Sequence, residues 1–189
     1  MRLWTMLAVT FGLGCESKGD DSGDSGGSEP ADCSEDNGEW PARVCPITAD
    51  ILVDGDLSDG SVLDNLDWAD QSDVACWPGT ENLNFTGAHL LYWIDQPEDT
   101  TLTAGVSPDV DVDVSIYVLQ MGTTRFEVPP DVVSVVSCEA GYDQTNDSNP
   151  GESETAAVIA TTNPYNVVIG VAGAGGATSG GFTLTVSLD

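Results

Sequence analysis

Clustered aspartates are the residues of this chain whose type and spacing could do chemistry. Asp54, Asp56 and Asp59 form one group, and Asp109, Asp111 and Asp113 form a second group with a spacing of every other residue. Calcium takes about six to eight oxygen ligands, often from loops, so both groups are candidate calcium sites. Neither is an EF-hand, because the first has Asp59 where that loop requires glycine and lacks glutamate at its last position. The alternative is a solvated loop and the polar face of a strand.

The chain has one histidine, His89, around which any Ser-His-Asp site would have to be built. Gly23-Asp24-Ser25-Gly26-Gly27 matches the nucleophile motif of chymotrypsin-like proteases. No histidine precedes it, however, and its flanks are low-complexity sequence, whereas a nucleophile needs a rigid site with an oriented base. We expect a structural histidine and a protein that is not an enzyme. A carboxylate-dependent hydrolase is the alternative, because spacing does not reveal which acids lie together.

The first 14 residues have the features of a secretory signal peptide. Arg2 is followed by an apolar run from Leu3 to Leu13, which is too short to cross a bilayer, since a spanning helix needs about 20 residues. The run ends in Gly12-Leu13-Gly14-Cys15, which resembles the lipobox of bacterial lipoproteins, although that motif usually has leucine in place of Gly12. The resemblance implies a palmitate-bearing membrane anchor on Cys15, and Glu16 beside it favours the outer membrane. The alternative is an ordinary signal peptide that leaves Cys15 as a free thiol.

The other four cysteines form an even set that suits disulfides in an oxidising compartment. Three pairings are open for Cys33, Cys45, Cys76 and Cys138. We favour Cys33 with Cys45, around a short loop, and Cys76 with Cys138, which would join distant parts of one domain. A zinc site is the rival interpretation, but no Cys-x-x-Cys pair is present.

Charge and composition divide the chain into a tether and a domain. The chain carries 32 acidic and 4 basic residues, a formal charge of −28, which repels nucleic acid. Residues 15–39 are mostly Ser, Gly, Asp and Glu, and such a segment cannot bury enough apolar surface to order itself. We therefore expect a signal peptide over 1–14, a lipidated, disordered acidic tether over 15–39, and one folded domain over 40–189.

The folded region shows the period-two alternation of half-buried strands, separated by Gly, Pro, Asn and Asp. No helix is needed to account for it, and its length suits a single core. The sequence therefore predicts an all-β fold, a single antiparallel, jelly-roll-like β-sandwich. The expected strands are Ile47–Val53, Ala88–Asp95, Thr101–Ser107, Val112–Gln120, Val132–Val136, Thr155–Thr161, Tyr165–Ala172 and Gly181–Leu188.

Three segments resemble the bacterial pre-peptidase C-terminal (PPC) domain, a β-sandwich often appended to secreted peptidases. Leu91-Tyr92-Trp93-Ile94 with Thr101-Leu102-Thr103 resembles its opening strands, and the run from Val110 to Val118 resembles its aspartate-led central strand. Residues 163–171 with Phe182-Thr183-Leu184-Thr185-Val186 resemble its closing strands. The resemblance covers a little over half the chain and implies a non-catalytic accessory or binding module. Related collagen-binding domains bind calcium, but no peptidase domain accompanies this one.

We therefore expect a surface lipoprotein with a membrane partner through its lipid, a protein or polysaccharide ligand, and no nucleic-acid partner. The alternative is a calcium-stabilised partner of a secreted peptidase. Tryptophans could also form an aromatic platform for sugar, although packing in the core is the default for large aromatic residues. The tryptophans of the mature chain are Trp40, Trp68, Trp77 and Trp93.

Overall fold

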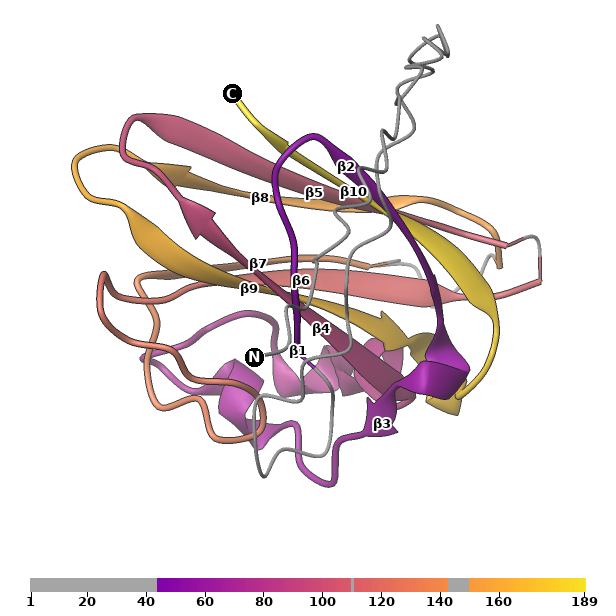
Figure 1. Ribbon diagram of the computed structural model, residues 1–189. Helices are drawn as coiled ribbons and strands as arrows, with labels where there is room; N and C mark the ends of the chain where they lie inside the picture. The colour runs from indigo at the N-terminus through magenta and orange to yellow at the C-terminus, as the bar shows by residue number, and fades with distance from the viewer. Residues whose placement is uncertain (1–43, 110, 143–149) are drawn as a thin grey trace, which may run out of the picture.

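The computed structural model describes residues 44–109, 111–142 and 150–189. Within these ranges the chain forms two β-sheets packed face to face, with a third layer of loops and short 3-10 helices against one of them (Figure 1). The predicted signal peptide and tether, with Cys15, Cys33 and Trp40, lie outside the described residues. Within the described ranges, no helix is long and apolar enough to span a membrane.

The larger sheet, sheet A, has the strand order β1-β4-β9-β6-β7, and β3 also pairs with β4. All its pairings are antiparallel except that of β1 with β4. Its strands are β1 Val44–Pro46, β3 Ser61–Val62, β4 Ala88–Gln96, β6 Val114–Gln120, β7 Ser137–Gly141 and β9 Tyr165–Gly173.

The smaller sheet, sheet B, is fully antiparallel with the order β2-β10-β5-β8. Its strands are β2 Ile51–Asp56, β5 Thr100–Pro108, β8 Glu154–Ala160 and β10 Gly181–Leu188. The inward side chains of both sheets form one apolar core, to which Phe182, Leu102 and Ile169 contribute. The predicted all-β sandwich is therefore confirmed.

A second core lies on the other face of sheet A, beneath the layer of 3-10 helices. Trp68, Trp77 and Phe85 come from this layer and pack on Tyr117 of β6. The helices of this layer are η2 Asp67–Asp70 and η3 Gly79–Phe85. Of the other two, η1 Leu57–Asp59 contributes Leu57 to the main core, and η4 Ala174–Gly176 follows β9. Because sheet A is covered on both sides, β6 is buried along its whole length.

Two expected strands are wrong in detail. The predicted strand Ile47–Val53 begins only at Ile51, because residues 47–50 carry the chain from β1 in sheet A to β2 in sheet B through a turn with Asp50 at a φ of 59°. The predicted strand Val132–Val136 is a loop, and the strand β7 follows it. In this loop the Val135 N–H donates to the carbonyl of Asp73 rather than to a neighbouring strand.

Candidate functional site

His89 is the second residue of β4 and points into the second core, where it is fully buried. Its Nε2 lies 2.8 Å from the Phe85 carbonyl, and its Nδ1 lies 3.1 Å from the Tyr117 hydroxyl. A carbonyl only accepts, so Nε2 carries the proton and Nδ1 accepts from Tyr117. Burial lowers the pKa of His89 to about 4, despite the opposing effect of the Phe85 hydrogen bond. The imidazole is therefore neutral near pH 7 and occupied by structural hydrogen bonds.

The surrounding aromatic cluster explains where the tryptophans lie. Trp77 stacks on Phe85 at a centroid distance of 3.8 Å, and Trp68 meets Trp77 edge to face. Both tryptophans are buried, so packing in the core is confirmed for them and they do not form a sugar platform. Trp93 differs, because it is half-buried on β4 and meets the exposed Phe126 edge to face at 5.9 Å.

The first aspartate group surrounds the end of β2 and the start of η1. Asp54 accepts a hydrogen bond from the Thr183 hydroxyl at 3.0 Å. Asp56 caps η1 by accepting from the Ser58 N–H at 2.8 Å, and it also accepts from the Gly180 N–H. Hydrogen bonds from Ser58 and then Gly180 lower the pKa of the Asp56 carboxyl.

Asp59, the third member of this group, lies on the rim of a small cavity of about 90 Å³ between the two sheets. Cys45, Asp54 and Tyr92 also line this cavity. Burial, and then the charge of Asp59, raises the pKa of the Tyr92 hydroxyl. Tyr92 is therefore un-ionised at physiological pH and serves as the polar edge of the apolar core.

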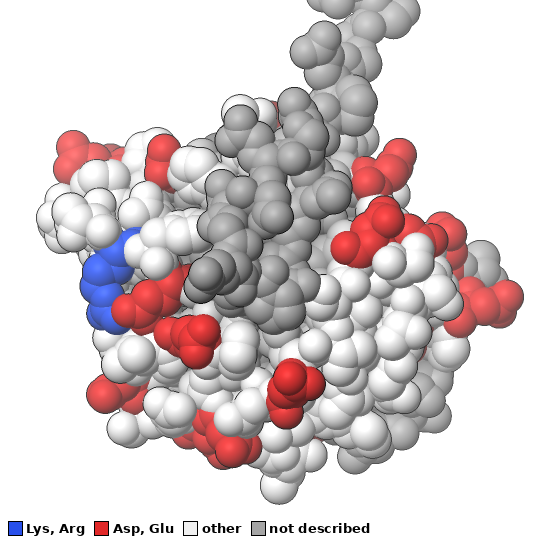
Figure 2. All heavy atoms as spheres, turned by 60° about the horizontal axis from the view of Figure 1, so that its bottom comes forward, with Lys and Arg blue, Asp and Glu red and all other residues white. Residues whose placement is uncertain are grey.

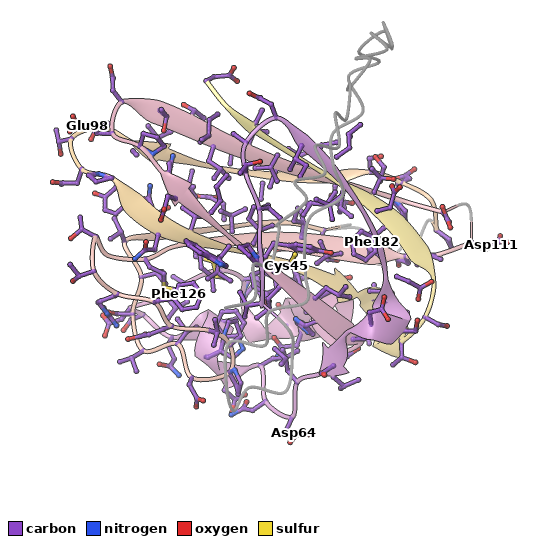
Figure 3. All side chains as sticks on the ribbon, in the orientation of Figure 1. Cys45, Asp64, Glu98, Asp111, Phe126 and Phe182 are labelled. Carbon is purple, nitrogen blue, oxygen red and sulfur yellow. A yellow bond between two sulfur atoms is a disulfide. The ribbon has the colours of Figure 1, made fainter. Side chains whose placement is uncertain are left out.

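The second aspartate group follows β5. The Asp109 N–H donates to the Gly181 carbonyl, and a Cβ on Gly181 would lie 2.5 Å from Asp109 Oδ2. Asp111 is exposed and points away from the sandwich (Figure 3). Asp113 is half-buried, and its carbonyl accepts from the Ala174 N–H.

The start of β10 lies between one member of each aspartate group. Gly181 pairs with Asp56 on one side, and Asp109 lies against it on the other. Sequence spacing could not show this proximity, because it depends on the register of three strands. Across the described residues, no group of three or more His, Cys, Asp or Glu side chains is arranged to hold a metal ion.

The disulfide between Cys76 and Cys138 is present, as the favoured pairing predicted. It attaches the layer of 3-10 helices to β7, across a sequence separation of 62 residues. Cys45 of β1 is also disulfide-bonded. Its expected partner, Cys33, lies outside the described residues.

Acidic side chains are spread over the face of the molecule that carries the loop layer (Figure 2). Arg125 lies on this surface and forms an ion pair with Glu127. Its guanidinium also donates to the Ser134 hydroxyl at 2.6 Å. Within the described ranges Arg125 is the only lysine or arginine, so the other charged side chains of this surface are acidic, apart from any on the undescribed residues.

Sequence reasoning missed a shallow depression on the outer face of sheet B, with a volume of about 320 Å³. Thr103, Gly105, Thr155 and Thr185 are among the residues that line it. The sequence does contain a signal for it, because the polar positions of β5 and β10 hold threonine and serine where an acidic chain would be expected to hold aspartate or glutamate.

Comparisons with known proteins bear on the fold. No family model matches the chain, and no curated protein matches it. Among solved structures, it is similar to the pre-peptidase C-terminal domain of a collagenase from Bacillus anthracis, with a TM-score of 0.43 and 11% sequence identity. That similarity covers 79% of this chain and 100% of the solved domain. The solved domain is of the same kind as the one whose strand motifs this sequence resembles.

Proposed function

We propose that this chain is a non-catalytic binding module, exported and attached to the cell envelope through a lipid on Cys15. The folded part is a β-sandwich, and the acidic segment of about 25 residues before it, predicted from composition to be a tether, would hold it a few nanometres from the membrane. The lipobox-like Gly12-Leu13-Gly14-Cys15 supports the anchor, and Glu16 supports an outer-membrane location.

The observation that carries the non-catalytic part of this proposal is the state of His89. It is the only histidine of the chain, it is fully buried, and both ring nitrogens are engaged by Phe85 and Tyr117. A general base must reach a substrate proton directly or through one water molecule. His89 has no such access, so its contribution is to the packing of the second core.

Metabolic labelling tests the anchor. The full chain is expressed in a bacterial host with a palmitate analogue, and the membranes are separated by density. Wild type should carry the label and sediment with the outer membrane. Cys15→Ser should lose the label, whereas the matched tether variant Ser17→Ala should keep it. Label that persists in Cys15→Ser would refute lipidation at this residue.

Turnover tests the non-catalytic role. The purified chain is incubated with peptide and glycoside substrates, in parallel with a variant that lacks the acidic side chains of the two aspartate groups. We expect no turnover by either protein. Hydrolysis that is lost in the variant would replace the binding role with that of a carboxylate-dependent hydrolase.

A calcium-stabilised partner of a secreted peptidase is a second proposal, favoured by the proximity of Asp56 and Asp109 at Gly181. A ligand that binds only the folded state raises its melting temperature. In this case calcium should raise the melting temperature of the full chain by several degrees relative to chelator. Asp109→Asn should abolish the shift, and the remote Asp64→Asn should retain it. Equal melting with calcium and with chelator would eliminate this proposal.

A further inference from the structure

The outer face of sheet B differs in charge from the rest of this acidic chain. The outward positions of its two central strands, β5 and β10, hold hydroxyl side chains or glycine and no charged residue. The chain as a whole carries 32 acidic residues, and on this face the edge strand β2 holds Asp54 and Asp56, so the two uncharged central strands stand out against a strongly negative background. The hydroxyl residues are Thr101, Thr103, Ser107, Thr183, Thr185 and Ser187.

A row of paired residues crosses this face from one edge strand to the other. The strand register places Leu52, Thr185, Gly105 and Thr155 side by side on β2, β10, β5 and β8. These four residues line the depression of about 320 Å³, and Thr103 and Ser187 line it from the next row. The depression therefore extends across the strands rather than along them.

Gly105 forms the floor of this depression. A Cβ there would lie 2.9 Å from the Thr185 hydroxyl oxygen and 3.7 Å from that of Thr155, so any larger residue would fill the space between them. The Thr185 hydroxyl donates to the Gly105 carbonyl at 3.1 Å and is thereby held beside the floor. Glycine within a strand weakens the sheet and often marks a place where a ligand or another backbone approaches closely.

The lining selects a ligand by its chemistry. Threonine and serine hydroxyls both donate and accept hydrogen bonds, and threonine methyl groups with the exposed Leu52 supply apolar contact. Asp50 also lines the depression, and its carboxylate accepts hydrogen bonds from hydroxyl groups. A ligand that matches this surface is uncharged, rich in hydroxyl groups and apolar on its ring faces. Polyanions are repelled by the surrounding acidic surface.

We propose that the depression across β2, β10, β5 and β8 is a binding site for a neutral polysaccharide, whose chain lies over Gly105. The proposal rests on the binding role argued above and assigns it a site and a ligand class. Thr103, Thr155 and Thr185 would hydrogen-bond the sugar hydroxyls, while Leu52 would contact a sugar ring.

Affinity electrophoresis of the full chain tests the proposal with three neutral polysaccharides, a β-glucan, a mannan and a xylan. At least one should retard wild type. The double variant Thr103→Val/Thr185→Val removes two hydroxyls but keeps β-branched side chains, and it should weaken the binding at least tenfold. Thr101→Val, on the same strand and face but outside the depression, should stay within twofold of wild type. Melting curves establish that each variant is folded.

Three outcomes would overturn the site. These are no retardation by any of the three polymers, equal binding by wild type and the double variant, or retardation only by a charged polymer. Lipid labelling of wild type alongside any of them would leave the envelope-anchored module standing while removing the polysaccharide site. If Cys15→Ser retained the label while the chain still bound polysaccharide, lipidation at Cys15 would be refuted and the polysaccharide site would stand.

Discussion

His89 is a buried polar residue whose surroundings disfavour protonation of its imidazole. Its ring nitrogens are satisfied only in the neutral form with the proton on Nε2, and burial lowers its pKa from 6.5 to about 4. A pKa that is lower in the folded than in the unfolded chain means that acid favours unfolding. The stabilising effect is fully present above about pH 6.5 and is lost as the pH falls toward 4.

This pKa can be measured directly, because the chain has one histidine. The imidazole Cε1–H resonance should not titrate between pH 8 and about 5.5. Between about pH 6.5 and 4, wild type should lose up to about 3 kcal/mol of unfolding free energy that His89→Gln does not lose. The Gln variant serves as the control because the carboxylates titrate in both proteins. A resonance that titrates near pH 6.5 would contradict the buried, neutral state.

Gly170 of β9 is required for close packing against Tyr117. A Cβ at this position would overlap the Tyr117 ring, which is itself fully buried. Gly170→Ala should therefore lower the unfolding free energy by about 1–3 kcal/mol or more in urea titration, because overpacking forces the ring or the backbone to move. Gly122→Ala is the matched control, since its Cβ would meet only Arg125 side-chain atoms at 3.5 Å or more. Equal stability of the two variants would show that the ring can be displaced at little cost.

At the scale of elements, two buried glutamines connect the sheets at one end of the main core. The Gln120 amide donates to Gln96 Oε1 at 2.9 Å and to the Ile159 carbonyl. The Gln96 amide donates in turn to the carbonyls of Val158 and Thr100. Gln96 and Gln120 belong to sheet A, and the accepting carbonyls belong to sheet B. The pair therefore provides hydrogen bonds across the interior of the sandwich.

A double-mutant cycle tests this connection. Gln120→Leu should lower the unfolding free energy by about 1–3 kcal/mol, because it leaves Gln96 Oε1 buried without its donor. Gln96→Leu should have a similar effect. The double variant should lose less unfolding free energy than the sum of the losses of the two single variants. The cost is measured by urea denaturation monitored by circular dichroism. Strict additivity would indicate that the two amides act independently.

At the scale of the whole molecule, the Cys76–Cys138 disulfide joins the loop layer to sheet A. In the chain-entropy treatment, a cross-link across a separation of 62 residues lowers the entropy of the unfolded chain and so raises its free energy by about 4 kcal/mol. The double variant Cys76→Ser/Cys138→Ser should therefore have a free energy of unfolding about 2–5 kcal/mol lower than wild type, measured by urea titration. The variant tests this bond alone, because the Cys45 disulfide is retained. Unchanged stability would show that strain or residual structure offsets the entropy.

Sequence reasoning identified most of the strands, because alternation is a local property. The polar and apolar alternation of β5, β6 and β10 reports which side of a strand is buried, and six expected strands match the observed ones to within two residues at either end. The Val132–Val136 prediction failed because β-branched residues favour extended backbone wherever they occur. A strand also needs a partner in register, and Val135 bonds to Asp73 instead.

The amino-acid sequence alone determined the all-β class, since the class depends on composition and short-range pattern; the acidic tether and the export signal with Cys15 stay predictions of the same kind. Only the tertiary structure decided how distant residues meet. It began β2 only at Ile51, placed Asp56 and Asp109 at Gly181, and aligned Thr185, Gly105 and Thr155 in one row. The physical reason is that strand order and register come from long-range pairing and burial, whereas the period of a strand repeats every second residue whichever neighbour it has.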